Sequence, residues 1–280
     1  MSSESPLLTP GDHAITLNSL SIAYTVQGSG PPLLFVTPGW GINRSLYTTT
    51  HQPLEQHFTV IYFSPRGCDG SERPSSPSLM LSRHTASDID EFRKKLGFET
   101  FDILGHSDGG TLAIAYAIYY PTRVRRLVPI CTNLLGFQRK DTSAAQEFAA
   151  LFEAADPQDD DAFKEYMLSI FHLYFYKPEP WVSQLKDSWK EKPSIWARRA
   201  RYASEAEDGW VQGNDLGKIQ AQRTLVITGR QDPRCGPEVS EAVVRGVKGS
   251  KLVLLDECGH IPWLERREEY FETSVKFLQE

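Results

Sequence analysis

The chain has 280 residues, 24% of them charged, and a formal net charge of −6. This length suits one large α/β domain that carries an insertion. The acidic balance excludes the basic footprint of a nucleic-acid-binding protein and the polybasic patch of a membrane-surface protein. The polar start, MSSESPLLTP, lacks the features of a secretion signal, and no run of 18 apolar residues follows. We therefore expect a cytoplasmic protein with neither a nucleic acid nor a membrane as partner.

The four cysteines lie far apart in the sequence: Cys68, Cys131, Cys235 and Cys258. No Cys-x-x-Cys pair or Cys/His cluster has the spacing of a zinc site, which favours free thiols in a reducing compartment. We expect no metal and no cofactor, since no cofactor motif is found either. The sequence does not indicate an oligomeric state.

The first third of the chain contains several predicted strands. Residues 13–27 alternate apolar and polar side chains around Asn18 and Ser19, which predicts an antiparallel hairpin. Residues 33–36, 59–63 and 101–104 are instead continuous apolar runs, typical of strands that are covered on both faces.

A helix is predicted over residues 85–96, between two of these strands. Thr85 and Asp88 have the spacing of a capping box, and Gly97 would end the helix. Strand, helix and strand in this order predict a parallel sheet. Further predicted elements are strands over 126–131, 224–229 and 251–256, and a final helix over 263–279.

Residues 134–218 contain no convincing strand and are predicted to form a helical cap, so that residues 1–133 and 219–280 make up the core. Apolar side chains from Phe163 to Tyr174 recur with helical spacing. Four of the six tryptophans of the chain lie within residues 134–218. The aromatic residues of this segment either pack a small subdomain or line a substrate pocket, and the two roles can coexist. The candidate pocket residues are Trp40, Phe171, Tyr174 and Trp210.

Ser107 stands in Gly-His-Ser-Asp-Gly, directly after a predicted strand and before a helix rich in small residues. This pattern matches the G-x-S-x-G elbow, in which a sharp turn lifts the serine hydroxyl above the sheet. A side chain at either flanking glycine would collide with a neighbouring strand or helix. The context predicts that Ser107 is a catalytic nucleophile.

A serine nucleophile needs an imidazole base and a carboxylate that orients the imidazole. Asp232 and His260 each follow a predicted strand in the second half of the chain, in the order expected for this elbow. Asp256 is the alternative acid, although it lies close to His260 in sequence. We expect His106, next to the nucleophile, to be structural, because adjacent residues on a tight turn point apart.

The tetrahedral intermediate needs two hydrogen-bond donors for its oxyanion. One is expected to be the N–H of Asp108, directly after the nucleophile. The other should come from the loop after the strand over 33–36. Pro38 has no N–H, so Gly39 is the first candidate and Trp40 the second.

Five segments of the chain resemble the α/β-hydrolase superfamily, in that family's order and over nearly the whole chain: TPGWG, SPRGCDGSERP, GHSDGG, GRQDP and GHIPWLE. The resemblance implies an α/β-hydrolase fold: a mostly parallel sheet with helices on both faces and an inserted helical cap. It also implies Ser107 as nucleophile, Asp232 as orienting acid, His260 as base, and Gly39 with Asp108 as oxyanion donors. The segment YFYKPEPW within the cap resembles that of proline-iminopeptidase-like members.

The sequence also departs from the pattern of those peptidases. They usually carry His-Gly-Gly-Pro-Gly where this chain has Thr37-Pro38-Gly39-Trp40-Gly41, and an acidic residue where it has Pro233. Glu205, Glu207 or Asp208 could instead hold the amino group of a peptide substrate.

We therefore expect a serine hydrolase that cleaves an ester or lactone of a small, partly apolar molecule through an acyl-enzyme. A proline-iminopeptidase-like aminopeptidase or amidase is the first alternative. A non-hydrolytic acyl transfer or cyclisation on the same fold, or a role in binding alone, is the second.

Overall fold

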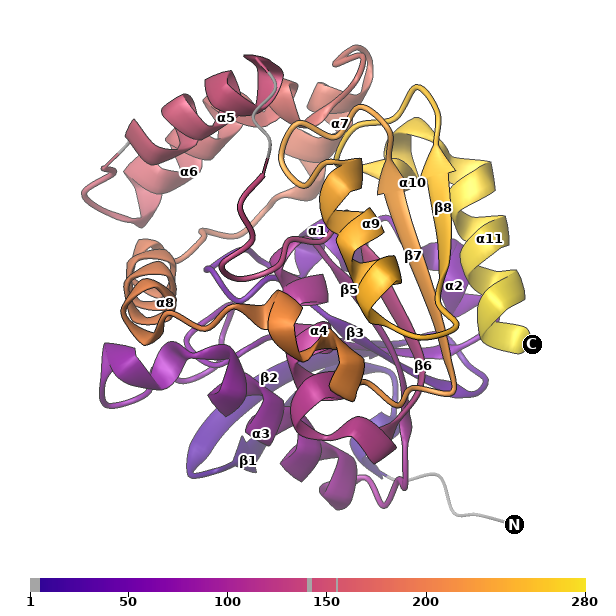
Figure 1. The fold of residues 1–280 in the computed structure, drawn as a ribbon. Helices are drawn as coiled ribbons and strands as arrows, with labels where there is room; N and C mark the ends of the chain where they lie inside the picture. Colours follow the sequence, from indigo (N-terminus) through magenta and orange to yellow (C-terminus); the bar gives the residue numbers. More distant parts are fainter. Residues whose placement is uncertain (1–5, 140–142, 155) are drawn as a thin grey trace.

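The computed structural model describes residues 6–139, 143–154 and 156–280. Its centre is an eight-stranded sheet in the order β1-β2-β4-β3-β5-β6-β7-β8 (Figure 1). β2 pairs antiparallel with β1 and β4, and the remaining pairs are parallel, which confirms the predicted mostly parallel sheet. The strands are β1 (Gly11–Leu17), β2 (Leu20–Gln27), β3 (Pro32–Val36), β4 (Thr59–Phe63), β5 (Phe101–His106), β6 (Val124–Ile130), β7 (Arg223–Gly229) and β8 (Lys251–Leu255).

The hairpin at the start of the sheet forms as predicted. Asn18 and Ser19 both have positive φ, and Leu17 pairs with Leu20 across the turn. Two central residues with positive φ match the right-handed twist of the strands that they connect.

Alternate residues of the strands pack on opposite faces of the sheet, each covered by helices. Leu34 and Val36 belong to one buried cluster with α3, α4 and α9, whereas Leu33 and Phe35 belong to another with α11. Burial on both faces explains the continuous apolar runs of β3, β4 and β5. The helices outside the segment between β6 and β7 are α1 (Ser45–Thr48), α2 (Gln52–Glu55), α3 (Ser82–Lys95), α4 (Asp108–Tyr119), α9 (Pro237–Gly246), α10 (Pro262–Glu265) and α11 (Arg267–Gln279), with 3₁₀ turns η1 (Pro6–Leu8), η2 (Pro77–Met80) and η3 (Pro121–Arg123).

Helix α3 differs from its prediction at the N-terminus. It begins at Ser82, and its N-cap residue, Leu81, makes no side-chain capping bond. Thr85 and Asp88 are buried inside the helix, where the Asp88 carboxylate accepts hydrogen bonds from Arg66. The predicted capping box is therefore wrong, because a tertiary ion pair uses the carboxylate. The predicted end at Gly97, with φ +75°, is confirmed.

Every described element between β6 and β7 is helical. Figure 1 shows α5, α6 and α7 beyond the edge of the sheet toward which the arrow of β7 points, with α8 beside them. The apolar pattern from Phe163 to Tyr174 forms α6 and then a 3₁₀ turn. We call the segment 134–218 the helical insertion; its elements are α5 (Ser143–Ala154), α6 (Asp160–Ile170), η4 (Phe171–Tyr174), α7 (Trp181–Ser188), α8 (Ile195–Asp208) and η5 (Gln212–Lys218).

The order of the strands reverses between β3 and β5, which are neighbours in the sheet. The loops that leave the carboxyl ends of two such strands run in opposite directions and open a crevice, where ligands of α/β proteins bind. The loop after β3 carries Gly39 and Trp40, and the turn after β5 carries Ser107. The sheet thus brings the nucleophile and the predicted oxyanion loop together. Within the described ranges, no helix has the length and apolar character needed to cross a bilayer.

Candidate active site

Ser107 lies in a strained turn between β5 and α4. Its backbone has φ 56° and ψ −125°, a conformation that residues other than glycine rarely adopt. Its N–H donates to the carbonyl of Ile130 at 2.8 Å, and its carbonyl accepts from the N–H groups of Gly110 and Thr111. These bonds hold a conformation that would otherwise relax, and strain of this kind is typical of functional residues.

The two glycines of the G-x-S-x-G pattern are sterically required. A Cβ atom at Gly105 would lie 2.3 Å from the carbonyl oxygen of Gly109 in α4, and one at Gly109 would lie 2.1 Å from the carbonyl oxygen of Val36 in β3. Both distances are far shorter than any van der Waals contact. Only glycine lets the helix approach the sheet this closely, as expected from the sequence.

His260 and Asp232 form a buried hydrogen-bonded pair. His260 Nδ1 lies 2.8 Å from Asp232 Oδ2, and Asp232 Oδ1 accepts from the backbone N–H groups of Arg234 and Cys235. Burial tends to raise the pKa of Asp232, but the imidazole and these hydrogen bonds outweigh burial, and the pKa lies below its ordinary value. An ionised carboxylate only accepts, so Nδ1 of His260 carries the proton and Nε2 is left to act as a base.

The alternative acid does not reach this histidine. Asp256 lies at the end of β8 with its side chain largely exposed, where it pairs with Arg230. Asp232 is thus the carboxylate that the structure joins to His260.

His106 has a structural environment. Its Nε2 lies 2.8 Å from the carbonyl oxygen of His260, and its Nδ1 lies 3.0 Å from the hydroxyl of Tyr47. The carbonyl can only accept, so Nε2 donates and Nδ1 accepts from the tyrosine. Burial, together with the nearby His260, holds the pKa of His106 well below its ordinary value. A neutral His106 fixes the loop that carries His260.

The predicted oxyanion donors differ in their hydrogen bonding. Asp108 is the first residue of α4, so its N–H has no acceptor within the helix. The N–H of Gly39 instead donates to the Asp108 carboxylate, with 2.7 Å between N and Oδ2. Within the described chain the N–H of Trp40 has no hydrogen-bond partner. The first candidate of the loop is therefore occupied in this structure, and the second is open.

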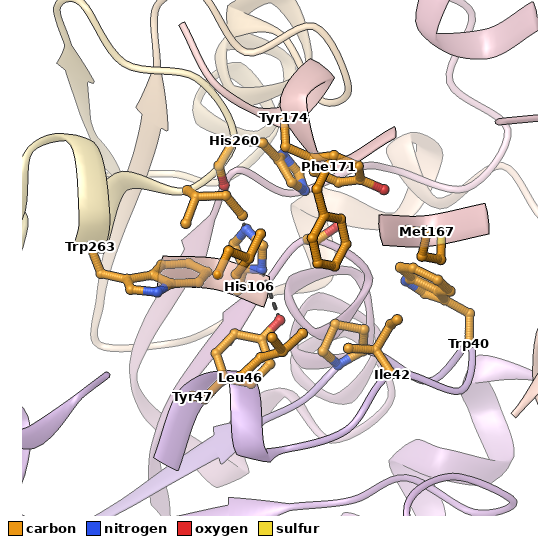
Figure 2. Close-up of a pocket in the computed structure, with 14 residues that line it drawn as sticks. Trp40, Ile42, Leu46, Tyr47, His106, Met167, Phe171, Tyr174, His260 and Trp263 are labelled. Atoms are coloured by element: carbon orange, nitrogen blue, oxygen red, sulfur yellow. Dashed lines mark hydrogen bonds between the residues drawn. The ribbon is translucent and has the colours of Figure 1, made fainter. Parts of the chain in front are cut away.

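A narrow cavity opens beside Ser107 and His260, between the sheet and the helical insertion (Figure 2). Its volume is about 40 Å³, enough for roughly three water molecules. Apart from Ser107 and the two histidines, its lining is apolar or aromatic, and no charged side chain is part of it among the described residues. The aromatic residues of the lining are Trp40, Tyr47, Phe171, Tyr174 and Trp263.

Of the predicted substrate-binding residues, three line this cavity: Trp40, Phe171 and Tyr174. Their role stays a prediction. Tyr47 and Trp263 also line the cavity, and no pattern in their local sequence distinguishes them from ordinary core aromatics.

The other three predicted substrate-binding residues lie elsewhere. Trp210 donates its indole N–H to Asp215 and packs on Tyr119. The Glu205 carboxylate is buried against Ser82 and Arg201, and Glu207 lies on a surface groove next to Ser78 and Arg83. None of these three residues is part of the lining, so the cavity gives no support to the prediction that they contact substrate. Glu205 and Glu207 lie on α8, and Trp210 follows it.

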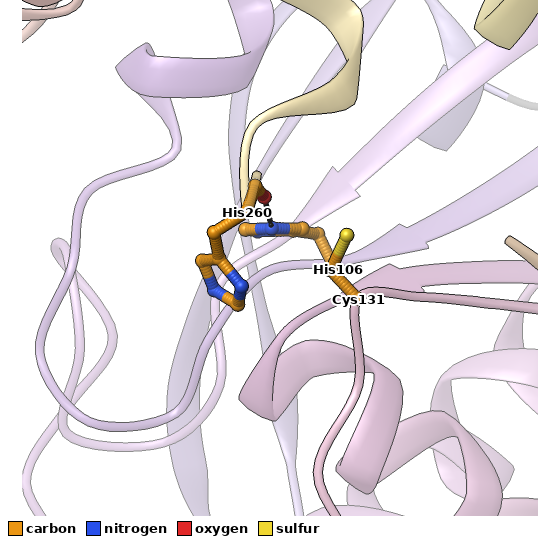
Figure 3. A group of neighbouring side chains, drawn as sticks. All are labelled: His106, Cys131 and His260. Carbon is orange, nitrogen blue, oxygen red and sulfur yellow. Dashed lines mark hydrogen bonds between the residues drawn. The ribbon is translucent and has the colours of Figure 1, made fainter. Parts of the chain in front are cut away.

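Two groups of residues have ligand atoms close enough for a metal: His106, Cys131 and His260 (Figure 3), and Asp232, Cys235 and His260. Both ring nitrogens of His106 and Nδ1 of His260 already make the hydrogen bonds given above. Burial raises the pKa of the Cys131 and Cys235 thiols, whereas metals bind the thiolate. These residues are therefore poorly suited to hold a metal. All four cysteines are free and buried.

Known proteins resemble this chain along most of its length. Proline iminopeptidase of Saccharolobus solfataricus is 24% identical, over 92% of this chain and 87% of its own. The pimeloyl-[acyl-carrier protein] methyl ester esterase of Nitrosospira multiformis is 26% identical, over 94% of this chain and 100% of its own. An α/β fold family hydrolase of Bacillus anthracis has a similar structure, with a TM-score of 0.80, 17% identity and coverage of 95% and 98% of the two chains.

The family comparison agrees with the fold. Residues 31–266 match the α/β hydrolase fold family, a span that contains every strand from β3 to β8 and each residue of the Ser107, Asp232 and His260 set. The chain belongs to the α/β hydrolase fold family.

Proposed function

We propose that the protein is a serine hydrolase that cleaves an ester or lactone of a small, partly apolar substrate through an acyl-enzyme. One observation carries the proposal: Ser107, on a strained turn, shares a cavity with a His260 whose other ring nitrogen is bonded to the buried Asp232. A hydroxyl, an imidazole and a carboxylate in this order are what activates a serine.

The reaction proceeds in two halves. Ser107 Oγ attacks the carbonyl carbon while His260 Nε2 takes the hydroxyl proton, and the carbonyl oxygen becomes an oxyanion that accepts from the Asp108 N–H. The intermediate then expels the alcohol, which receives the proton from His260. A water molecule then attacks the acyl carbon as His260 takes its proton. The bond from the acyl carbon to Ser107 Oγ breaks, His260 returns the proton to Oγ, and the acid is released. Asp232 stabilises the imidazolium that forms in each half.

The chemistry of the cavity favours an uncharged, compact substrate. Its lining is apolar apart from Ser107 and the two histidines, and its volume is small. A substrate with a free amino group needs a carboxylate, and the described lining offers none, since Glu205 is engaged by Ser82 and Arg201. The relative named a methyl ester esterase supports ester cleavage, and the one named a proline iminopeptidase supplies the alternative.

A substrate panel tests the proposal. Turnover of aryl acetates, aryl butyrates and small lactones should exceed that of prolyl anilide at least tenfold, and Ser107→Ala should lower kcat by about 10⁴-fold or more. Faster turnover of prolyl anilide would favour the aminopeptidase. Full esterase activity in Ser107→Ala would reject the assigned nucleophile, and ligand binding without any hydrolysis would favour a binding role.

A further inference from the structure

The side chain of Asp108 contacts the oxyanion loop from the opposite side of the site. Asp108 follows the nucleophile, and its own N–H is the first oxyanion donor. Its carboxylate Oδ2 accepts from the N–H of Gly39 at 2.7 Å, across 69 residues of sequence. Asp108 thus belongs to the oxyanion site twice: its backbone N–H is a donor, and its side chain holds the loop that carries the second donor.

A buried arginine of the helical insertion holds this carboxylate. Arg201 of α8 donates from Nε to both oxygens of Asp108, at 3.0 and 2.9 Å, and from Nη2 to Oδ1 at 2.6 Å. Its side chain is 2% exposed. Burial tends to lower the pKa of Arg201, but Asp108 and Glu205 outweigh burial and raise it. The guanidinium therefore stays charged beside the carboxylate.

The insertion is anchored to the core through the same arginine. Arg201 Nη1 donates to Glu205 Oε1 at 3.1 Å, and that oxygen also accepts from the N–H and the hydroxyl of Ser82, each at 2.6 Å. Ser82 begins α3, which belongs to the core. Arg201 is consequently fixed from two sides, and its position determines where the Asp108 carboxylate lies.

The charge of Asp108 makes this arrangement consequential for an oxyanion. A carboxylate next to a developing negative charge opposes its formation, most strongly in a site from which water is excluded. A bidentate guanidinium cancels that charge and also fixes the orientation of the carboxylate. The same carboxylate is needed to hold the loop, since it accepts the Gly39 N–H and leaves Trp40 as the open amide.

We infer that Asp108 and Arg201 are a positioning pair for the oxyanion site: the Asp108 carboxylate fixes the 37–41 loop through Gly39, and Arg201 neutralises it. Both act on the oxyanion through the loop and through charge, without touching the reacting atoms by their side chains. This inference rests on the proposed serine hydrolase function and extends it to residues of the helical insertion.

A double-mutant cycle tests the pair by the hydrolysis of an aryl ester. Arg201→Met leaves an uncompensated carboxylate beside the oxyanion, so kcat should fall about 10²-fold with KM changed less than threefold. Asp108→Asn keeps an acceptor for Gly39 without the charge and should cost about tenfold. The double variant should regain activity to the level of Asp108→Asn, because a neutral amide needs no arginine.

The rescue distinguishes positioning from a merely structural role. If Arg201 only holds the insertion in place, Asp108→Asn cannot restore kcat, and the two losses should multiply to about 10³-fold. That result, or an Arg201→Met variant whose kcat equals that of the wild type, would overturn the inference.

Two control variants distinguish an effect on the oxyanion site from a loss of folding. Arg201→Lys keeps the charge and should fall between the wild type and Arg201→Met in kcat, which reports on the pair even if the methionine variant fails to fold. Arg66→Met breaks a matched buried Arg–Asp pair that does not line the cavity and should leave kcat unchanged per folded molecule. A wild type that hydrolyses no ester would overturn both proposals, whereas an active wild type with multiplying losses would overturn only this inference.

Discussion

Two buried Arg–Asp pairs of this protein are both held through Nε and Nη2 and have different surroundings. Arg66 donates from Nε and Nη2 to the two oxygens of Asp88 at 2.7 and 2.6 Å. Arg201 donates from Nη2 to Asp108 at 2.6 Å, and its Nε is shared between both oxygens at 3.0 and 2.9 Å. Asp88 also accepts from Asn18, which ties the β1–β2 turn to α3. Asp108 instead accepts from the Gly39 N–H beside the nucleophile. The interaction is the same, and the third group on the carboxylate determines whether it serves the fold or the chemistry.

The largest expected effect concerns a third buried carboxylate, Asp232, which orients His260. Asp232→Asn removes the charge and favours the wrong imidazole tautomer, so kcat should fall about 10⁴-fold. Steady-state kinetics on an aryl ester measure this loss. Asp256→Asn is the matched control, because Asp256 is an exposed carboxylate that pairs with the exposed Arg230. A greater loss of kcat in Asp256→Asn than in Asp232→Asn would assign Asp256, and not Asp232, as the carboxylate that orients His260.

The Arg66–Asp88 pair, which does not line the cavity, should affect the stability of the fold without affecting activity. Arg66→Met leaves the fully buried Asp88 without its cation, and the free energy of unfolding should fall by about 3–5 kcal/mol. Urea unfolding measures this free energy, and kcat per active site, which should equal that of the wild type, measures the effect on activity. A fall in kcat as large as that of Arg201→Met would remove the distinction between the two pairs.

The wall of the cavity should determine how large a substrate can be. Phe171→Leu shortens a side chain that is 3% exposed and lines the cavity. The ratio of kcat/KM for a butyrate over an acetyl ester should rise about tenfold, in the range that one or two methylenes contribute to specificity. Phe175→Leu is the matched control, since Phe175 is buried nearby but is not part of the lining. Equal ratios in the two variants would contradict this role of Phe171.

The smallest expected effect concerns the pH dependence of stability. Glu265 accepts from the N–H groups of Gly259 and Tyr176, each at 2.7 Å, and so joins the His260 loop to the insertion. Burial raises its pKa to about 7 in spite of these donors, with a smaller contribution from Asp232. In the unfolded chain the carboxyl ionises near its ordinary pKa of 4.5. Between these two values only the unfolded state ionises, so stability should fall as pH rises toward 7.

Glu265→Gln should remove this part of the pH dependence. Urea midpoints at pH 5 and pH 8 measure it, and the variant should lose less stability between them than the wild type does. Glu269→Gln, at an exposed ion pair with Arg266, is the control and should lose as much stability between pH 5 and pH 8 as the wild type does. An equal loss in Glu265→Gln would contradict the raised pKa of Glu265 in the folded protein.

The sequence predicted best what depends on short-range pattern and on strand ends. The elbow around Ser107 is defined by two glycines within five residues, and Asp232 and His260 follow strands whose carboxyl ends meet at one edge of the sheet. The mostly parallel sheet was equally predictable, because burial on both faces leaves continuous apolar runs.

What the sequence missed depends on distant contacts. Asp88 looked like a capping residue, yet Arg66 from another loop recruits it. Glu205 and Trp210 looked available to substrate, yet Glu205 accepts from Ser82 of the core and Trp210 donates to Asp215. The bond from Gly39 to Asp108 joins residues far apart in the chain and follows only from the folded loop.

The most direct measurement of the central claim is the mass of the protein after treatment with a fluorophosphonate probe. We predict one adduct at Ser107, formed rapidly by the wild type, about 10²-fold or more slowly by His260→Ala, and not at all by Ser107→Ala. An adduct on another residue, or a rate that does not depend on His260, would contradict the assignment of Ser107 as a nucleophile activated by that histidine.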